Sequence, residues 1–347
     1  MNKVPIVALA VSVVPAAALV LALGACGHWQ GLREALEPDV LPPVLLEVRV
    51  TGPRSLALEF DEGLRHPPEA LRIEPPLPVD GTGGSGPLVE VSTGEQEPGA
   101  RYLLEATVCD EAGNSLTVLV EFYGHNPRVP LVLINEFTTR GTGNHPDLVE
   151  LKVLESGDMG GVVLYQGTPG SYDDRLVFPA FEIEAGRFIL VHFKPQGIPE
   201  EIDETEDPGL SGGLDAAAEA FDFWVPAGTG LSGNNGVISV YRCPGGALLD
   251  GVLYSNRTSD SDTRYGGFGT RNAWERAQEL VRDGGWRIEG DGVRPEDAVN
   301  PEGSTGTRSI CRDARSTDTD SRHDWHIVPT SGFTFGRENS DERYLRD

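Results

Sequence analysis

Two apolar stretches, LVLINEF at residues 131–137 and DLVELKVL at residues 147–154, decide the fold of this chain. The first is a run of aliphatic and β-branched residues, which is typical of a strand. The second alternates, because Leu148 and Glu150 are separated by single apolar residues and so share one face of a strand. A Gly-rich loop separates the two stretches. The sequence therefore predicts two neighbouring strands, the second of which has two unlike faces.

Short apolar runs continue this pattern through residues 130–339, which we expect to form one β domain. Glycine and proline, with 43 and 26 residues, separate the runs and indicate many turns. With 347 residues, of which 39% are hydrophobic, the chain is long enough for about two domains with real cores. The sequence thus predicts an all-β protein of two β-sandwich domains in series. Further strands of this domain are expected at residues 160–167, 188–193, 236–241 and 247–254, the last two joined by the turn at residues 243–246.

Residues 44–126 are expected to form the first domain. SLALEF at residues 55–60 places Leu56, Leu58 and Phe60 on one face of a strand. Other expected strands lie at residues 44–50, 71–73 and 87–92 and in a hairpin of residues 102–109 and 115–123, whereas PVDGTGGSGP at residues 78–87 is expected to be a loop.

Two segments of this first domain, SLALEFDEGL at residues 55–64 and YLLEATVCDEAGNSL at residues 102–116, resemble bacterial immunoglobulin-like modules. The resemblance implies a β-sandwich that acts as a spacer or in adhesion, with no chemistry of its own. Asp61, Glu62 and Asp110 can be interpreted as calcium ligands or as solvated acids of turns, and we favour the turns.

The second domain resembles a lamin-tail domain, and several ordered motifs carry this resemblance. They are Ile134-Asn135-Glu136, Asp147-Leu148-Val149-Glu150-Leu151, Ala185-Gly186-Arg187-Phe188, Leu249-Asp250-Gly251-Val252-Leu253-Tyr254, Ser309-Ile310-Cys311-Arg312, Asp324-Trp325 and Gly336-Arg337-Glu338-Asn339. The resemblance implies a compact immunoglobulin-like β-sandwich. It also implies a role in recruitment or tethering, with a protein or a glycan as partner.

The chain departs from the lamin-tail pattern in an insert at about residues 255–307. AWERAQELVRDGG at residues 273–285 has apolar residues at the spacing of a helix, including Ala277 and Leu280, and Gly284 as a stop. The insert is either a decoration or a binding lid, and we favour a decoration.

The acidic residues of these motifs invite a catalytic interpretation. Glu136 and Glu150 lie on neighbouring strands, and glycoside hydrolysis uses two carboxylates about 5–10 Å apart. The lamin-tail motif already accounts for them, because each is then expected to hydrogen-bond the backbone or Arg312 and so to fix the sheet. Arg312 is expected to pair with Asp324 as a structural clamp, and Trp325 to cover the edge of the core with its indole N–H satisfied locally.

Other constellations are weak. His323, Asp324 and His326 cluster in sequence, but alternation along a strand places His323 opposite the other two, so we expect no metal site. STDTDSRHDWH at residues 316–326 contains serine, histidine and aspartate, but adjacency in sequence does not make a catalytic triad. We therefore predict no catalytic residue, no metal and no cofactor. The rival interpretations are an envelope hydrolase, which needs a pocket gathering Asp147, Glu150, Asp324 and His326, and a calcium-dependent adhesin.

The N-terminal sequence predicts where the protein is located and indicates no activity. Residues 4–23 are apolar and end in Leu23-Gly24-Ala25-Cys26, which resembles the lipobox of bacterial lipoproteins. The resemblance implies a signal peptide at residues 1–25, lipid (including palmitate) on Cys26, and a tether at residues 26–43. The run is also long enough to span a bilayer as an uncleaved anchor, and a soluble secreted form is the remaining alternative. Each alternative places the body outside the cytoplasm, in the periplasm or at the cell exterior.

Charge and cysteine content limit the possible partners. The net charge of −26 repels nucleic acid, whose binding relies on cationic side chains, so we expect no nucleic-acid partner. Besides Cys26, three cysteines remain, so at least one is unpaired within the chain. Cys243 and Cys311 either form a disulfide or stay free. Residues 340–347 are expected to be a tail.

Overall fold

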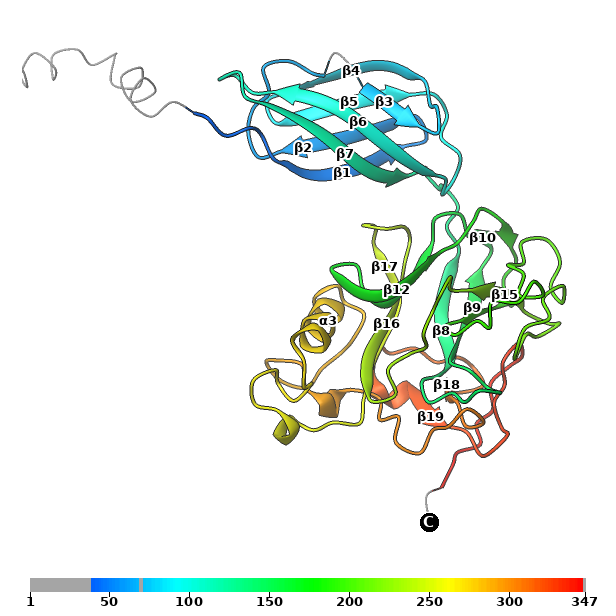
Figure 1. Cartoon of the computed structure of the whole chain (residues 1–347). Helices are drawn as coiled ribbons and strands as arrows, with labels where there is room; N and C mark the ends of the chain where they lie inside the picture. Colours follow the sequence, from blue (N-terminus) through cyan, green and yellow to red (C-terminus); the bar gives the residue numbers. More distant parts are fainter. Residues whose placement is uncertain (1–38, 69–70, 346–347) are drawn as a thin grey trace, which may run out of the picture.

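The computed structural model describes residues 39–68 and 71–345 and confirms the all-β fold (Figure 1). Two β-sandwiches follow one another, with the strands of residues 45–123 in the first and those of residues 131–327 in the second. The predicted signal peptide and Cys26 lie outside the described residues. Within the described ranges, no helix combines the length and the apolar character needed to cross a membrane.

The first sandwich has one antiparallel sheet in the order β1-β2-β5-β4 and another in the order β3-β6-β7. Its strands are β1 (Leu45–Gly52), β2 (Ser55–Phe60), β3 (Leu71–Glu74), β4 (Val79–Ser85), β5 (Leu88–Thr93), β6 (Arg101–Cys109) and β7 (Ser115–Tyr123). Leu56, Leu58 and Phe60 are buried as predicted and pack with Leu104 and Val108 between the two sheets. The expected hairpin is present, because β6 pairs with β7 along its whole length.

The prediction that residues 78–87 form a loop is wrong, because most of this segment is strand β4. β4 pairs antiparallel with β5 at the edge of its sheet, and its residues, three of which are glycine, are mostly exposed. A strand at an edge needs only backbone hydrogen bonds from one neighbour, so it can form without the apolar alternation that marks other strands.

The second sandwich packs a four-stranded sheet, ordered β12-β11-β16-β17, against a six-stranded sheet, ordered β15-β14-β9-β8-β18-β19. Its strands are β8 (Leu131–Thr138), β9 (Leu148–Glu155), β10 (Gly157–Asp158), β11 (Val163–Thr168), β12 (Ser171–Val177), β13 (Glu182–Ile183), β14 (Phe188–His192), β15 (Phe221–Trp224), β16 (Asn235–Tyr241), β17 (Leu248–Ser255), β18 (Ile310–Arg312) and β19 (Trp325–Ile327). The main core lies between these two sheets and contains Ile134, Val149, Leu151, Ile238 and Val252.

Both faces of β9 are buried, although its sequence alternates. Val149 and Leu151 enter the main core, whereas Leu148 lies in a second apolar cluster with Leu190, Ala220 and the partly buried Phe335. The C-terminal segment, defined as residues 333–340, therefore lies over the outer face of the six-stranded sheet. This cover is why Glu150 is completely buried.

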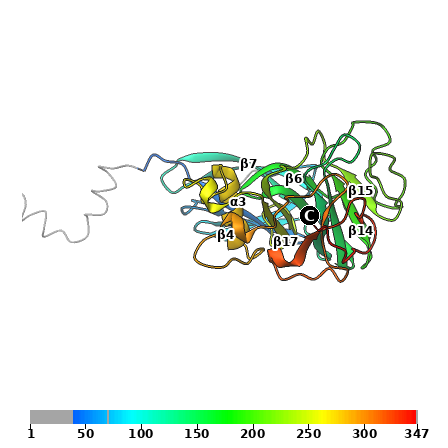
Figure 2. The same cartoon turned by 90° about the horizontal axis from the view of Figure 1, so that it is seen from below.

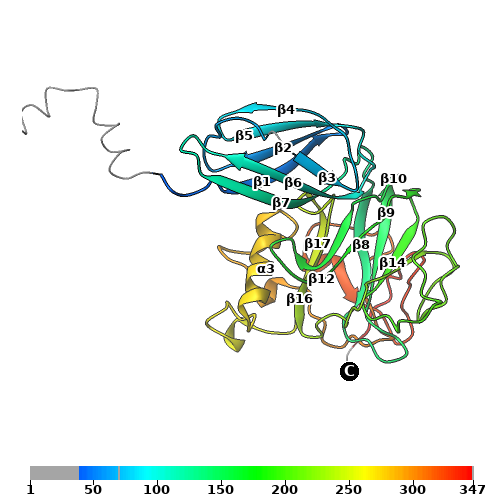
Figure 3. The ribbon, with the colours of Figure 1, turned by 45° about the horizontal axis from the view of Figure 1, so that its top comes forward.

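The insert contributes a covering layer to the four-stranded sheet. It holds the helix α3 (Arg271–Arg282) and the short 3₁₀ turns η1 (Ser259–Ser261) and η2 (Pro295–Asp297); a third such turn, η3 (Arg322–Asp324), precedes β19. Thr270 caps α3 by accepting a hydrogen bond from the Ala273 N–H, and Ala277 and Leu280 enter the main core. In Figures 1, 2 and 3, α3 lies on the far side of β17 from β14 or β15. The insert is therefore an integral part of the packing, which favours a decoration over a lid.

Direct contacts join the two sandwiches. The Asn126 side-chain amide donates to the carbonyl oxygens of Asp158 at 2.7 Å and Gly160 at 2.8 Å. Gly99 has a φ of +67°, and a Cβ there would lie 2.1 Å from the Gly160 carbonyl carbon. Only glycine fits this left-handed backbone at such a close approach.

Candidate functional site

A network of buried polar side chains lies between β8, β9 and the C-terminal segment. A β-bulge shifts the register of β8 between Ile134 and Glu136, so that Glu136 lies opposite Glu150. Asn135, Glu136 and Glu150 are all completely buried, and Asn339 is nearly so. A buried polar group is costly unless it is hydrogen-bonded, so the network depends on its partners.

A backbone N–H of the C-terminal segment donates to each of the two carboxylates. Glu136 accepts hydrogen bonds from the Ser309 hydroxyl and from the Thr334 backbone N–H at 2.9 Å and hydroxyl at 2.5 Å. Glu150 accepts from the Asn135 side-chain amide at 2.7 Å and from the Gly336 N–H at 2.6 Å. Of the two predicted kinds of partner, backbone amides are found.

Asn339 completes this network. Its side-chain amide donates to the backbone oxygens of Asn135 at 3.1 Å and Arg312 at 3.0 Å. Asn339 therefore ties the C-terminal segment to β8 and β18 at once.

The electrostatics of the pair are those of a buried dyad. Burial raises the pKa of Glu136, and burial together with the charge of Glu136 raises the pKa of Glu150 well above its ordinary value. A raised pKa would suit a general acid, but a general acid must reach its substrate. Both carboxyl groups are completely buried beneath the C-terminal segment. A substrate could not reach them there, so their geometry suits a structural role.

Arg312 forms a second buried centre and does not bind the glutamates, contrary to one of the predicted alternatives. Its Nη2 lies 3.2 Å from the nearer carboxylate oxygen of Asp250, and its Nη1 lies 2.9 Å from Asp318 and 3.5 Å from Asp324. Its Nε donates to the Ile134 carbonyl at 2.8 Å. The predicted clamp to Asp324 is thus present, but it is the longest of three ion pairs.

Asp250 is the innermost of these acids. It accepts hydrogen bonds from the backbone N–H groups of Ile134 at 2.6 Å and Gly251 at 2.7 Å. Burial raises its pKa to about 7, against the opposing effect of Arg312. Arg312 and Asp250 together join β18, β17 and β8 through one ion pair.

Trp325 covers the edge of the core as predicted, but its indole N–H is not satisfied. The ring makes an edge-on contact with Phe137, with centroids 5.2 Å apart, and the Arg312 guanidinium lies 4.6 Å from its centroid. Neither neighbouring side chain offers an acceptor, and within the described residues its Nε1 has no hydrogen-bond partner. The expectation of a local acceptor is therefore wrong.

The residues proposed for a hydrolase do not meet in one pocket. Asp147 binds the N–H groups of Gly141 and Leu231, at 2.7 and 2.8 Å. Asp324 accepts from Thr319 and Ser321, as the last residue of η3. His326 lies 2.9 Å from the Ser340 carbonyl oxygen, and the neighbouring His323 is exposed. A cavity of about 590 Å³ is lined by His326 but by none of Asp147, Glu150 and Asp324.

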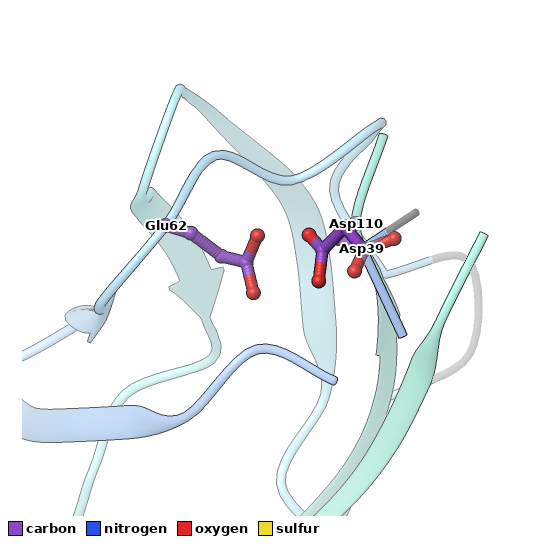
Figure 4. Close-up of side chains that lie close together, drawn as sticks. All are labelled: Asp39, Glu62 and Asp110. Carbon is purple, nitrogen blue, oxygen red and sulfur yellow. The ribbon is translucent and has the colours of Figure 1, made fainter. Parts of the chain in front are cut away.

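Two of the predicted turn acids come together with a third acid that was not predicted. Glu62 and Asp110 lie close to Asp39, with one carboxylate oxygen of each within 4.8 Å of the others (Figure 4). Asp110 accepts hydrogen bonds from the Gly113 and Asn114 N–H groups at 2.6 and 2.8 Å, as expected for a turn acid. Asp61, the third predicted acid, instead binds the N–H of Val44.

The three described cysteines, Cys109, Cys243 and Cys311, are free thiols. Of the two alternatives for Cys243 and Cys311, free thiols are therefore the one found. Burial and the nearby Glu136 and Glu150 carboxylates raise the pKa of Cys311.

Sequence reasoning missed a buried histidine–aspartate pair. The Nε2 of His192 lies 2.6 Å from the Asp222 carboxylate, and both residues are completely buried. The Trp224 ring stacks on His192 at 3.8 Å between centroids. The pair arises because β15 adds parallel to β14, a pairing between segments thirty residues apart that no local pattern indicates.

The sheet order and this buried network define the second sandwich as an all-β domain. Its buried polar side chains join the strands to one another and to the C-terminal segment. Residues 130–327 match the family model described as TP_1001 protein second domain, and the chain belongs to this family. The match ends before the C-terminal segment.

A protein of Treponema pallidum (strain Nichols), described as an uncharacterized protein, is 28% identical to this chain over 159 residues. The aligned part covers 46% of this chain and 40% of the relative. The chain thus spans less than half the length of this relative.

Proposed function

We propose that the protein is a cell-envelope lipoprotein, anchored by lipid on Cys26, whose lamin-tail-like second sandwich binds or tethers an envelope protein or a glycan without catalysing a reaction. The observation that carries this proposal is the complete use of the motif carboxylates as structural acceptors. Glu136, Glu150 and Asp250 are buried and hydrogen-bonded to groups that hold strands or the C-terminal segment.

The anchor is supported by the sequence alone. A single lysine, Lys3, precedes an apolar run, and this run ends in Leu23-Gly24-Ala25-Cys26. One acyl chain binds a membrane only marginally, whereas several anchor a protein stably, and the resemblance to lipoproteins implies several. The first sandwich would then serve as a spacer between the membrane and the second.

Lipidation can be tested by mass spectrometry of the N-terminal peptide and by labelling with a palmitate analogue. We expect an acylated N-terminus beginning at Cys26, which Cys26→Ala abolishes. Cys109→Ala is the matched control and should keep the lipid. A membrane-fraction peptide that runs intact from Met1 through Cys26 would contradict the anchor.

Binding without catalysis can be tested by crosslinking in intact envelopes. We expect the second sandwich to crosslink reproducibly to a defined protein or glycan, with a lower yield for Cys26→Ala because the protein leaves the membrane. If the protein has a robust hydrolytic activity that Glu136→Gln abolishes, the non-catalytic proposal is wrong.

A further inference from the structure

A basic cavity opens on the second sandwich, and none of Asn135, Glu136, Glu150 and Asn339 lines it. Its volume of about 590 Å³ lies within the range of about 300–1,000 Å³ that is typical of small-molecule sites. The insert, Ile310 of β18, the region of η3 and β19, and the pair Arg343 and Tyr344 line it together.

The charge of this cavity is opposite to that of the protein. Arg257, Arg322 and Arg343 line it together with His323, whereas Glu296 is its one acidic lining residue. The whole chain carries a net charge of −26, so this cluster of three guanidinium groups is a local excess of positive charge in an acidic protein. A cleft lined by one sign of charge focuses the field and concentrates ligands of the opposite sign.

The acidic residue in this cavity is already engaged elsewhere. Both carboxylate oxygens of Glu296 accept hydrogen bonds from Ser259, one from its N–H and one from its hydroxyl, each at 2.7 Å. Arg257 donates through Nε to the Gly267 carbonyl at 2.8 Å, and Arg322 donates to the Glu296 carbonyl. These acceptors are neutral, so they orient the two guanidinium groups without cancelling their charge.

Within the described part of the chain, the three arginines also lack ion-pair partners. Among the residues that the structure describes, no carboxylate oxygen lies within 4.0 Å of Arg257, Arg322 or Arg343. Like charges held together without counter-charges repel one another, so such a cluster is expected where a ligand supplies the missing negative charge. Guanidinium groups present paired N–H donors that match phosphate and carboxylate oxygens.

The remaining walls limit the kind of anion. Trp325, Ile327 and Tyr344 give the cavity apolar surface beside the arginines. The acidic remainder of the protein would repel a long polyanion. We propose that this cavity binds a small organic anion carrying phosphate or carboxylate groups, held by Arg257, Arg322 and Arg343. This site goes beyond the role proposed above, which concerns a protein or a glycan, and it does not depend on the lipid at Cys26.

Isothermal titration calorimetry of the full chain in detergent at low salt, with pyrophosphate and citrate as probes, tests this site. We expect at least one probe to bind, with an affinity that falls as salt is added. The double variant Arg322→Gln/Arg343→Gln should bind at least about tenfold more weakly, because it loses two charge-assisted contacts. Binding of pyrophosphate alone would identify a phosphorylated ligand, and binding of citrate alone a carboxylated one.

Arg315→Gln is the matched control, because Arg315 is exposed on the same sandwich and does not line the cavity. It should bind as the wild type does, and near-UV circular dichroism should show that all variants are folded. The site is refuted if neither probe binds, or if the double variant binds as tightly as the control. Neither result would affect the lipidation test, so the two proposals can fail separately.

Discussion

Glu136 and Glu150 lie directly opposite each other on β8 and β9, completely buried and within one hydrogen-bonded network. Their partners Thr334 and Gly336 belong to the C-terminal segment, which therefore packs on two carboxyl groups of raised pKa. The arrangement links the stability of the second sandwich to pH.

The pH dependence can be isolated with Glu150→Gln. The pKa of Glu150 is raised in the folded state above its ordinary value of 4.5, so the folded protein retains a proton that the unfolded chain has lost. Its contribution to stability is therefore fully present below the unfolded pKa and is lost as the pH rises through the folded pKa. Between pH 5 and 8, the stability of the wild type should fall relative to that of Glu150→Gln.

Urea unfolding followed by tryptophan fluorescence measures this difference, because all the described tryptophans lie in the second sandwich. A difference between the two proteins that stays constant from pH 5 to 8 would show that Glu150 does not bind an extra proton in the folded state.

Removal of the Arg312 side chain should destabilise the second sandwich severely. Arg312→Ala leaves Asp250 and Asp324 buried without their cation, and the loss of one partner of a buried ion pair costs about 3–5 kcal/mol. Arg315→Ala, at an exposed site, should change the free energy of unfolding by less than about 0.5 kcal/mol. Urea unfolding of both variants checks this, and equal costs would refute the clamp.

The close contact between the sandwiches depends on Gly99. In Gly99→Ala the new methyl group would collide with the Gly160 backbone, in addition to the strain of about 1–3 kcal/mol for a left-handed residue. Gly113→Ala is the control, because Gly113 has a φ of +98° and open space around it. Calorimetry should show a larger loss of stability for Gly99→Ala, with the unfolding of the two sandwiches separated. If both variants lose the same stability, the contact between Gly99 and Gly160 does not contribute to the stability of the protein.

The insert should behave as part of the core. Leu280→Ala removes a completely buried side chain of α3 that packs closely against Gly251 of β17. Such truncations cost about 2–5 kcal/mol. Gln278→Ala, on the exposed face of the same helix, should cost less than about 0.5 kcal/mol. A detachable lid would instead leave the unfolding midpoint of the sandwich unchanged in Leu280→Ala.

Local patterns predict the strands of this protein well and its long-range pairings poorly. The β6–β7 hairpin and the β16–β17 pair were predictable, because alternation and turn residues lie within one short segment. The edge strand β4 lacks alternation, and β15 joins the sheet through a parallel pairing. Neither leaves a local signal.

The candidate site divides in the same way. The Arg312–Asp324 contact joins residues twelve apart and was predictable, whereas the shorter ion pair between Arg312 and Asp250 joins residues 62 apart. The cover over Glu150 comes from Gly336, which lies 186 residues further along the chain. Burial of this kind follows from the crossovers of the sheet, which the alternation of β9 does not encode.

The position of the C-terminal segment also sets an order for biosynthesis. Glu136 accepts a hydrogen bond from Thr334, which lies 198 residues further along the chain, so the outer face of the six-stranded sheet stays uncovered until the C-terminal segment has been synthesised. The late arrival of Thr334 and Gly336 therefore delays the burial of Glu136 and Glu150 until all the strands of the second sandwich have been synthesised.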